Sequence, residues 1–165
     1  MSLPLAAVHR ELVSGAGQIE SSKGPSAPRV AADATNSARE AVESYLRDAA
    51  KEAAKILKLQ KKKTVTKDVL INAFVKDCGV VKLVDLSSSK RAGEMRGLPE
   101  AGVVRIFKAE LAKDASRLSG EASSVLVNAA SAYLRAIGQR AGMLVRAGKR
   151  NTIKESDVVD ARKLL

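Results

Sequence analysis

The chain has 165 residues, enough for one ordinary domain or two very small ones. Apolar residues make up 45% of the chain and aromatic residues only 2%, which excludes a disordered protein and favours closely packed helices. The net charge is +11, with 13 basic against 9 acidic residues in 1–78 and 12 against 7 in 98–165. Both halves are therefore basic, which favours a polyanion such as nucleic acid as partner; a basic protein without such a partner is the alternative.

Several classes of protein are excluded by what the sequence lacks. Cys78 is the only cysteine, so it permits no internal disulfide, and we expect it to be a buried apolar residue. Residues 1–10 lack the pattern of a signal peptide, and no stretch of about 18 apolar residues predicts a membrane span. His9 is the only histidine, and we expect it to be an exposed helix residue. With no recurring catalytic constellation, we predict no metal site, no cofactor and no enzymatic activity.

The first half of the chain predicts three helices. The first starts at Pro4, because proline is favoured in the opening turn of a helix. The second carries an apolar stripe at helical spacing that includes Tyr45, and its length of about 42 Å predicts that a partner helix lies across it. The expected elements are a short helix over 4–14, a Gly-, Ser- and Pro-rich loop over 14–28, a long helix over 31–59, a basic loop over 60–65 and a short helix over 67–78.

The second half predicts the same order of elements after a linker over 79–97, which starts apolar and becomes polar. Gly138 and Gly142 weaken the second long helix locally, and they allow a crossing helix to approach it closely. Tyr133 lies on the apolar stripe of this helix, so we expect it in the core, as we do Tyr45. The expected elements are a short helix over 99–113, a long helix over 119–147, a basic loop over 148–153 and a last helix over 154–165.

The two halves are copies of one unit. Shifting the chain by 88 positions aligns residues 45–47 with 133–135, both reading Tyr-Leu-Arg. Arg29 then falls on Arg117, and Thr64 falls on Thr152. Upstream the shift becomes 95, and it aligns Leu3, Pro4 and Arg10 with Leu98, Pro99 and Arg105. A repeat of this kind predicts one structural unit twice, over 1–78 and 98–165, joined by the linker.

The repeated segments resemble archaeal histones. Residues 3–10 (LPLAAVHR) and 98–105 (LPEAGVVR) are similar to the start of those proteins. Residues 149–158 (KRNTIKESDV) resemble the second loop and third-helix entry of histones, and residues 63–69 resemble the same segment with one residue fewer. The chain therefore resembles two archaeal-type histones fused in one polypeptide, a histone doublet, over all but the linker.

This resemblance implies an all-α fold in which two tandem histone folds, each a short, a long and a short helix, form an intramolecular handshake pseudodimer. The first loop of one copy then lies beside the second loop of the other, so that Arg29 meets Thr152 and Arg117 meets Thr64. The family inserts such an arginine into the DNA minor groove, where narrowing enhances the negative potential. The resemblance also implies a structural ion pair between Arg150 and Asp157, with Lys62 and Asp68 as a less specific counterpart.

The implied partner is double-stranded DNA, bound through phosphates and the minor groove. The implied DNA-binding residues are Arg10, Arg29, Lys61, Lys62, Lys63, Thr64, Arg105, Arg117, Lys149, Arg150, Asn151 and Thr152. Archaeal histones associate further through a histidine at the end of the second helix, where this chain has Leu59 and Ala147. Apolar Leu59, with Ile56 and Ile71, offers a different contact for self-association into tetramer-like or longer assemblies.

We therefore expect an architectural chromatin protein that binds duplex DNA without sequence specificity, bends or wraps it and compacts it. The alternative is a histone-fold interaction subunit of a transcription complex or another DNA-associated complex. The absence of long basic tails favours an archaeal or bacterial nucleoid, and viral or nuclear chromatin is the alternative location.

Overall fold

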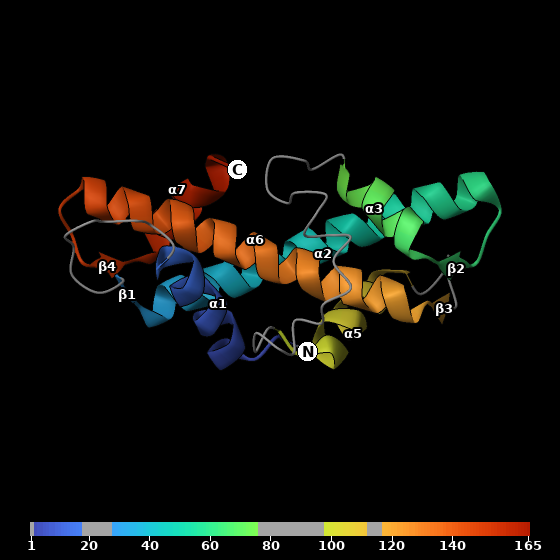
Figure 1. Ribbon diagram of the computed structural model, residues 1–165, viewed down its shortest axis with the longest axis horizontal. Coiled ribbons are helices and arrows are strands. Elements are labelled where there is room, and N and C mark those ends of the chain that lie inside the picture. The colour runs from blue at the N-terminus through green and yellow to red at the C-terminus, as the bar shows by residue number, and fades with distance from the viewer. Residues whose placement is uncertain (1, 18–27, 76–97, 112–116) are drawn as a thin grey trace. The chain divides into compact units, whose positions relative to one another are not determined.

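The computed structural model describes residues 2–17, 28–75, 98–111 and 117–165 (Figure 1). Within these ranges the helices and two-residue strands follow the order α1 (Leu5–Gly17), β1 (Arg29–Val30), α2 (Ala32–Gln60), β2 (Thr64–Val65), α3 (Lys67–Val75), α5 (Glu100–Leu111), β3 (Arg117–Leu118), α6 (Gly120–Ala147), β4 (Thr152–Ile153) and α7 (Glu155–Lys163). The predicted all-α class, with short, long and short helices in each copy, is confirmed. The expected linker over 79–97 and Cys78 lie outside the described residues.

The first helix of each copy begins directly after a proline. The carbonyl of Pro4 accepts the N–H of Val8, and that of Pro99 accepts the N–H of Val103, each at 3.2 Å. Proline suits this position because the first helical N–H groups have no partner within the helix. Leu3 and Leu98, which precede the two prolines, are both buried.

Helix α1 extends to Gly17, so the prediction that a loop begins at Ser14 was wrong at its start. Gly15 and Ala16 are buried within the helix. A Cβ atom placed on Gly15 would overlap the backbone carbonyl of Arg135. The glycine therefore serves close packing of α1 on another helix, rather than a turn.

Two compact units form, and each contains elements of both sequence copies. Unit 1 comprises Met1–Leu3 and Glu43–Ala132, and unit 2 comprises Pro4–Val42 and Tyr133–Leu165. The division falls inside both long helices, so α2 and α6 each contribute to both units. Each core therefore needs side chains from both copies, a packing consistent with the expected handshake pseudodimer.

The core of unit 1 is built from small and branched side chains with two phenylalanines. The rings of Tyr45 and Phe74 stack with their centroids 5.4 Å apart. The N–H of Leu3 donates to Oε1 of the buried Glu43 at 2.9 Å, which ties the N-terminus to α2. The largest fully buried side chains of this unit are those of Phe107, Leu3, Leu46, Leu57, Leu70 and Leu126.

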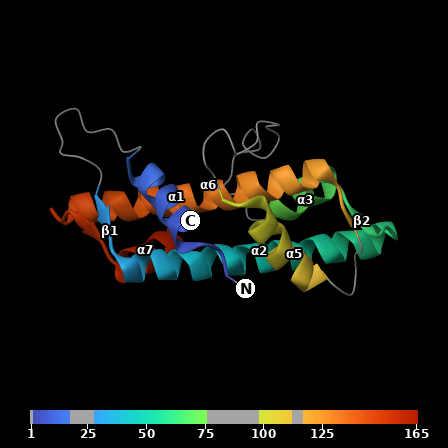
Figure 2. The same cartoon turned by 90° about the horizontal axis from the view of Figure 1, so that it is seen from below.

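In unit 2, α1 crosses the C-terminal part of α6 at short range (Figure 2). A Cβ on Gly138 would overlap the carbonyl of Leu12, just as one on Gly15 would overlap Arg135. The expectation that Gly138 admits a crossing helix is therefore met, and the crossing helix is α1. Beside this contact, Nε of Arg135 lies 3.1 Å from Oε2 of Glu11.

Candidate nucleic-acid interface

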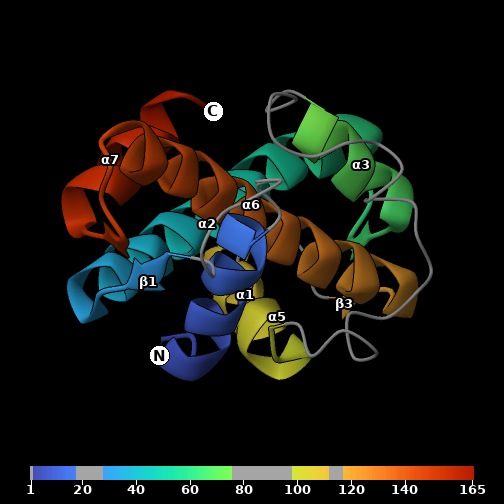
Figure 3. The same ribbon diagram turned by 60° about the vertical axis from the view of Figure 1, so that its left-hand side comes forward.

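In unit 2, the loop before α2 lies beside the loop after α6. Strands β1 and β4 pair in parallel, with Arg29 opposite Thr152 and Val30 opposite Ile153. The N–H of Arg29 donates to the carbonyl of Asn151 at 2.8 Å. We call Arg29, Lys149, Arg150, Asn151 and Thr152 the Arg29–Thr152 edge; α7 follows β4 directly and begins beside β1 (Figure 3).

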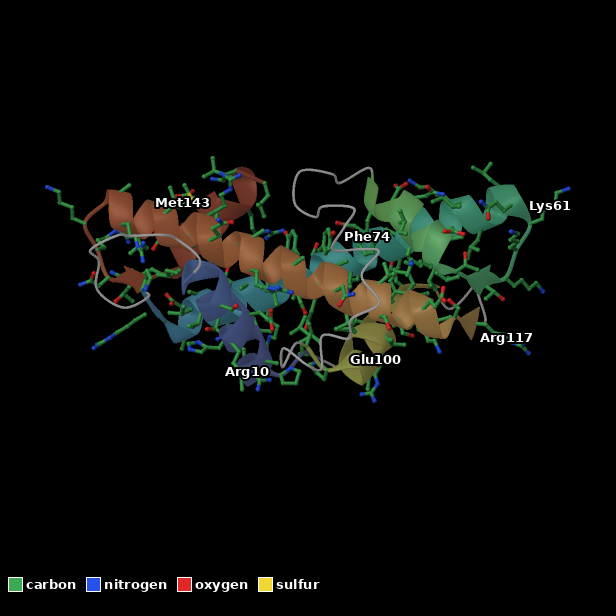
Figure 4. The ribbon with its side chains drawn as sticks, in the orientation of Figure 1. Arg10, Lys61, Phe74, Glu100, Arg117 and Met143 are labelled. Atoms are coloured by element: carbon green, nitrogen blue, oxygen red, sulfur yellow. The ribbon has the colours of Figure 1, made fainter. Side chains whose placement is uncertain are left out.

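Unit 1 repeats this arrangement with the roles of the two copies exchanged. Strands β2 and β3 pair in parallel, with Thr64 opposite Arg117 and Val65 opposite Leu118. Figure 4 shows the Lys61 and Arg117 side chains extending from the same end of the unit. We call Lys61, Lys62, Lys63, Thr64 and Arg117 the Thr64–Arg117 edge.

Strand alternation orients the side chains of both edges. Val65 and Ile153 are buried, whereas the neighbouring Thr64 and Thr152 are half-buried. Successive side chains of a strand point to opposite sides, so a buried valine or isoleucine leaves the neighbouring threonine on the outer side. Arg29 and Arg117, which pair with the two threonines, are exposed. Each edge thus presents one arginine from one copy beside one threonine from the other.

Arg150 is held by Asp157 in a bidentate pair. Its Nη1 and Nη2 donate to the two carboxylate oxygens at 3.1 and 2.7 Å, and the N–H of Lys154 donates to Oδ2 at 2.9 Å. Burial alone would raise the pKa of Asp157, but these hydrogen bonds and the positive charges of Arg150 and Lys154 lower it overall. The hydrogen bond from the guanidinium and the charge of Asp157 raise the pKa of Arg150. The pair fastens the second loop to the first turn of α7.

The counterpart in copy one does not form. Among the residues that the structure describes, no hydrogen bond or ion pair joins Lys62 to Asp68, and both side chains are exposed. Asp157 is the third residue of α7, whereas Asp68 is the second of α3, because copy one has one residue fewer before its helix. The expectation of a Lys62–Asp68 pair was therefore wrong.

The two edges consequently differ in charge. Within the described part of the chain, Lys61, Lys62, Lys63 and Arg117 make no ion pair with a carboxylate. At the Arg29–Thr152 edge, the guanidinium of Arg150 is already shared with Asp157. The Thr64–Arg117 edge therefore carries more positive charge that an external anion can neutralise.

Arg10 on α1 and Arg105 on α5 are exposed, each within its own unit. Beside Arg10 lies the buried Glu11, which the sequence reasoning did not single out. Burial raises the pKa of Glu11, and the charges of Arg135 and Arg10 oppose that rise. Its position in the sequence indicates the buried face of the helix, because Glu11 lies four residues after the buried Ala7 and four before the buried Gly15.

Other kinds of site find no support in the described residues. His9 is exposed on α1, with Nδ1 3.3 Å from Oγ1 of Thr35. In the ranges described, no three His, Cys, Asp or Glu side chains gather where they could hold a metal ion. None of the helices there is long and apolar enough to cross a membrane.

Known proteins are similar to this chain in sequence and in structure. The sequence matches the family described as histone-like transcription factor (CBF/NF-Y) and archaeal histone over residues 1–74 and again over 96–161. The crystal structure of the histone from Methanopyrus kandleri is similar, with a TM-score of 0.72 and 22% identity, covering 96% of this chain and 92% of that one. No curated protein sequence matches the chain. The doubled match confirms the predicted resemblance, and the structural likeness confirms the fold.

Proposed function

Because the chain belongs to the family of histone-like transcription factors (CBF/NF-Y) and archaeal histones, we propose that it binds duplex DNA without sequence specificity and bends and compacts it. Membership of this family indicates DNA binding and association with the chromosome, and the family is non-enzymatic. We propose in addition that the protein acts in an archaeal or bacterial nucleoid, with viral or nuclear chromatin as the alternative location.

The observation that carries the proposal is the pair of composite edges, one in each unit. Each sets an exposed arginine opposite a threonine of the other copy. A guanidinium enters a minor groove favourably where bending narrows it, because the negative potential is strongest there. The contact reads groove width rather than base edges, so it tolerates many sequences.

Phosphate contacts surround each arginine. At the Thr64–Arg117 edge they come from Lys61, Lys62 and Lys63, and at the Arg29–Thr152 edge from Lys149, Arg150 and Asn151. Arg10 and Arg105 add contacts from the first helices. Such cations release counterions from DNA, so the logarithm of affinity falls with that of salt at a slope of about −0.9 per neutralised phosphate.

Titration of labelled duplexes of unrelated sequences tests the proposal by fluorescence anisotropy. At low salt we expect dissociation constants of about 1–100 μM or tighter, similar for all sequences and rising steeply with salt. Absence of binding in that range at low salt would refute the proposal. A preference for one sequence by more than about tenfold would refute its non-specific character.

The second candidate is an interaction subunit of a DNA-associated complex, and one apolar side chain favours it. Leu59, at the end of α2, is 86% exposed, which suits burial by another protein. A variant with Arg29→Ala and Arg117→Ala discriminates between the two candidates. If it folds normally and binds DNA as the unchanged protein does, the interaction subunit is favoured.

We also propose that doublets associate on DNA through the same end of α2. Ile56 and Ile71 are half-buried in unit 1, and Leu59 is exposed in the last turn of α2. Leu59→Lys should reduce the mass of complexes formed on duplexes of increasing length. Met143→Lys, which adds the same charge at an exposed residue of α6, is the control. Equal masses for the two variants would contradict self-association through Leu59.

Finally, we propose that the two copies are residues 1–78 and 98–165, joined by 79–97. The two separate family matches, over 1–74 and 96–161, support a division into two copies.

A further inference from the structure

Two lysines have a left-handed backbone conformation, which residues other than glycine rarely adopt. Lys61 has a φ of 52° and Lys149 a φ of 55°, and no other non-glycine residue of the described ranges has a positive φ. The two residues are equivalent, since they are 88 positions apart in the repeat. Lys61 follows α2 directly, and Lys149 follows α6 after Gly148. Each lysine opens one of the two edges. The same unusual conformation thus occurs twice, with the same residue type.

The conformation belongs to a specific helix ending. The N–H of Lys61 donates to the carbonyl of Lys58 at 3.3 Å, and the N–H of Lys62 donates to that of Leu57 at 3.1 Å. In the other copy, the backbone N–H of Lys149 donates to the carbonyl of Arg146 at 3.0 Å, and that of Arg150 donates to the carbonyl of Val145 at 2.9 Å. This is the Schellman motif, in which the left-handed residue is usually glycine.

Lysine is a costly choice at this position. A Cβ atom crowds the backbone in the left-handed region, and glycine avoids the clash. The chain has a glycine at the adjacent Gly148, yet no described glycine has a positive φ and the left-handed residue is Lys149. The position therefore holds a lysine twice, where the fold alone favours glycine.

Within the described residues, the two ammonium groups make no contact that would offset this conformational cost. Both side chains are exposed, and neither makes an ion pair or side-chain hydrogen bond with the described residues. Figure 4 shows Lys61 extending away from the end of α2. Attraction to the helix dipole is the remaining internal benefit, and it is small for an exposed cation.

We propose that Lys61 and Lys149 occupy these left-handed positions because each ammonium binds a phosphate of duplex DNA, at the expense of stability. The inference rests on the proposed function and adds to it a conflict between stability and binding at two defined residues. Replacement by glycine should therefore have opposite effects on folding and on DNA affinity. A residue that serves only the fold would not produce this opposition.

The test compares substitutions by thermal unfolding and by anisotropy with a labelled duplex. Lys61→Gly with Lys149→Gly should raise Tm, by about 2–4 °C for each relieved residue. The same variant should weaken DNA binding by about threefold to tenfold per lysine and reduce the salt slope by about 0.9 per lysine. Lys61→Ala with Lys149→Ala should weaken binding equally and leave Tm nearly unchanged, because the Cβ remains.

Lys63→Gly provides the matched control for stability. It removes one charge from the same loop, but its φ is not positive, so glycine there should lower Tm. A fall in Tm on Lys61→Gly and Lys149→Gly would overturn the inference, because the lysines would then stabilise the fold. Unchanged DNA affinity and salt slope would overturn it while leaving the proposed function intact. Failure of the unchanged protein to bind DNA would overturn both.

Discussion

Asp157 and Glu11 are both buried carboxylates, yet their surroundings act on them in opposite directions. Two hydrogen-bonded partners stabilise the charge of Asp157 and lower its pKa. Burial dominates at Glu11 and raises its pKa in spite of Arg135. Stability should therefore respond to pH with opposite signs at these two residues.

Asp157→Asn should lower the free energy of unfolding at pH 7 by about 1–2 kcal/mol, because it weakens a helix cap and a loop contact. The folded pKa of Asp157 is below the ordinary value of 3.8, so its contribution is complete above that value and is lost as pH falls through the folded pKa. Urea unfolding at pH 7 and pH 3 measures this loss. Asp160→Asn on the same helix, at an exposed side chain, should cost little at either pH. Equal effects of the two substitutions would contradict the structural role of Asp157.

The free energy of unfolding of the Glu11→Gln variant, relative to that of the unchanged protein, should increase as pH rises. The folded pKa of Glu11 lies above the ordinary 4.5, so the unchanged protein loses stability as pH rises from that value through the folded pKa. Glutamine is neutral throughout and does not lose it. Urea unfolding at pH 4 and pH 7 provides the comparison, with Glu40→Gln at an exposed residue as control. A difference that is constant with pH, or that reverses, would refute the prediction.

The sequence predicted the burial of apolar side chains better than that of charged side chains. Tyr45 and Tyr133 lie on helical stripes and are buried, as expected. Glu11 and Glu43 lie on buried faces too, but an acidic residue in a helix is normally exposed, so neither was predicted. The Arg150–Asp157 pair came from a family resemblance, because spacing alone does not bring a loop and a helix together.

At the scale of elements, the contact between α1 and α6 depends on two glycines. Alanine favours a helix over glycine by about 1 kcal/mol, so both glycines oppose helix formation where they stand. They lie where a Cβ would meet backbone rather than a flexible side chain. Backbone cannot yield locally, so the two helices would have to separate.

Gly138→Ala should therefore lower the free energy of unfolding by about 1–3 kcal/mol, in spite of the higher helix propensity of alanine. Gly120→Ala is the matched control, since the same helix has nothing within 4 Å of a Cβ there. It should leave stability unchanged or raise it by up to about 1 kcal/mol. Thermal unfolding of the two variants measures the difference. A stabilised Gly138→Ala would contradict the close crossing.

The helices were predicted within a few residues, and α1 ends later than predicted, at Gly17 instead of Ser14. Periodicity defines where an apolar stripe runs, and proline marks where a helix begins. The glycines after Ser14 predicted a loop, because sequence alone does not distinguish a glycine that ends a helix from one that admits a neighbour. The partner that decides between them is Arg135, 120 positions away in the chain.

At the scale of the whole molecule, each unit is assembled from both copies, so neither copy holds a complete core. Residues 98–165 alone should be largely unfolded at low concentration, or should pair with another copy as concentration rises. Circular dichroism against concentration measures this, and mixing with residues 1–78 should restore helicity. A fragment that is folded and monomeric at low concentration would contradict the exchange of elements.

The repeat and the order of helices follow from the sequence, but the exchange of elements between copies does not. Periodicity within 119–147 indicates a buried stripe without specifying which helix covers it. Two separate units, each made of one copy, would fit the same periodicity. The resemblance to histones predicted that Arg29 lies beside Thr152 and Arg117 beside Thr64. The paired strands have these residues opposite each other.

The salt dependence of duplex binding, measured for paired arginine variants, tests most directly whether the two composite edges bind DNA. Arg29→Ala with Arg117→Ala should weaken binding and reduce the slope of log affinity against log salt by up to about 1.8. Arg140→Ala with Arg162→Ala removes the same charge from exposed residues outside both edges, and it should leave the slope nearly unchanged. Equal affinities and parallel slopes for the two variants would contradict a role of the edges in DNA binding.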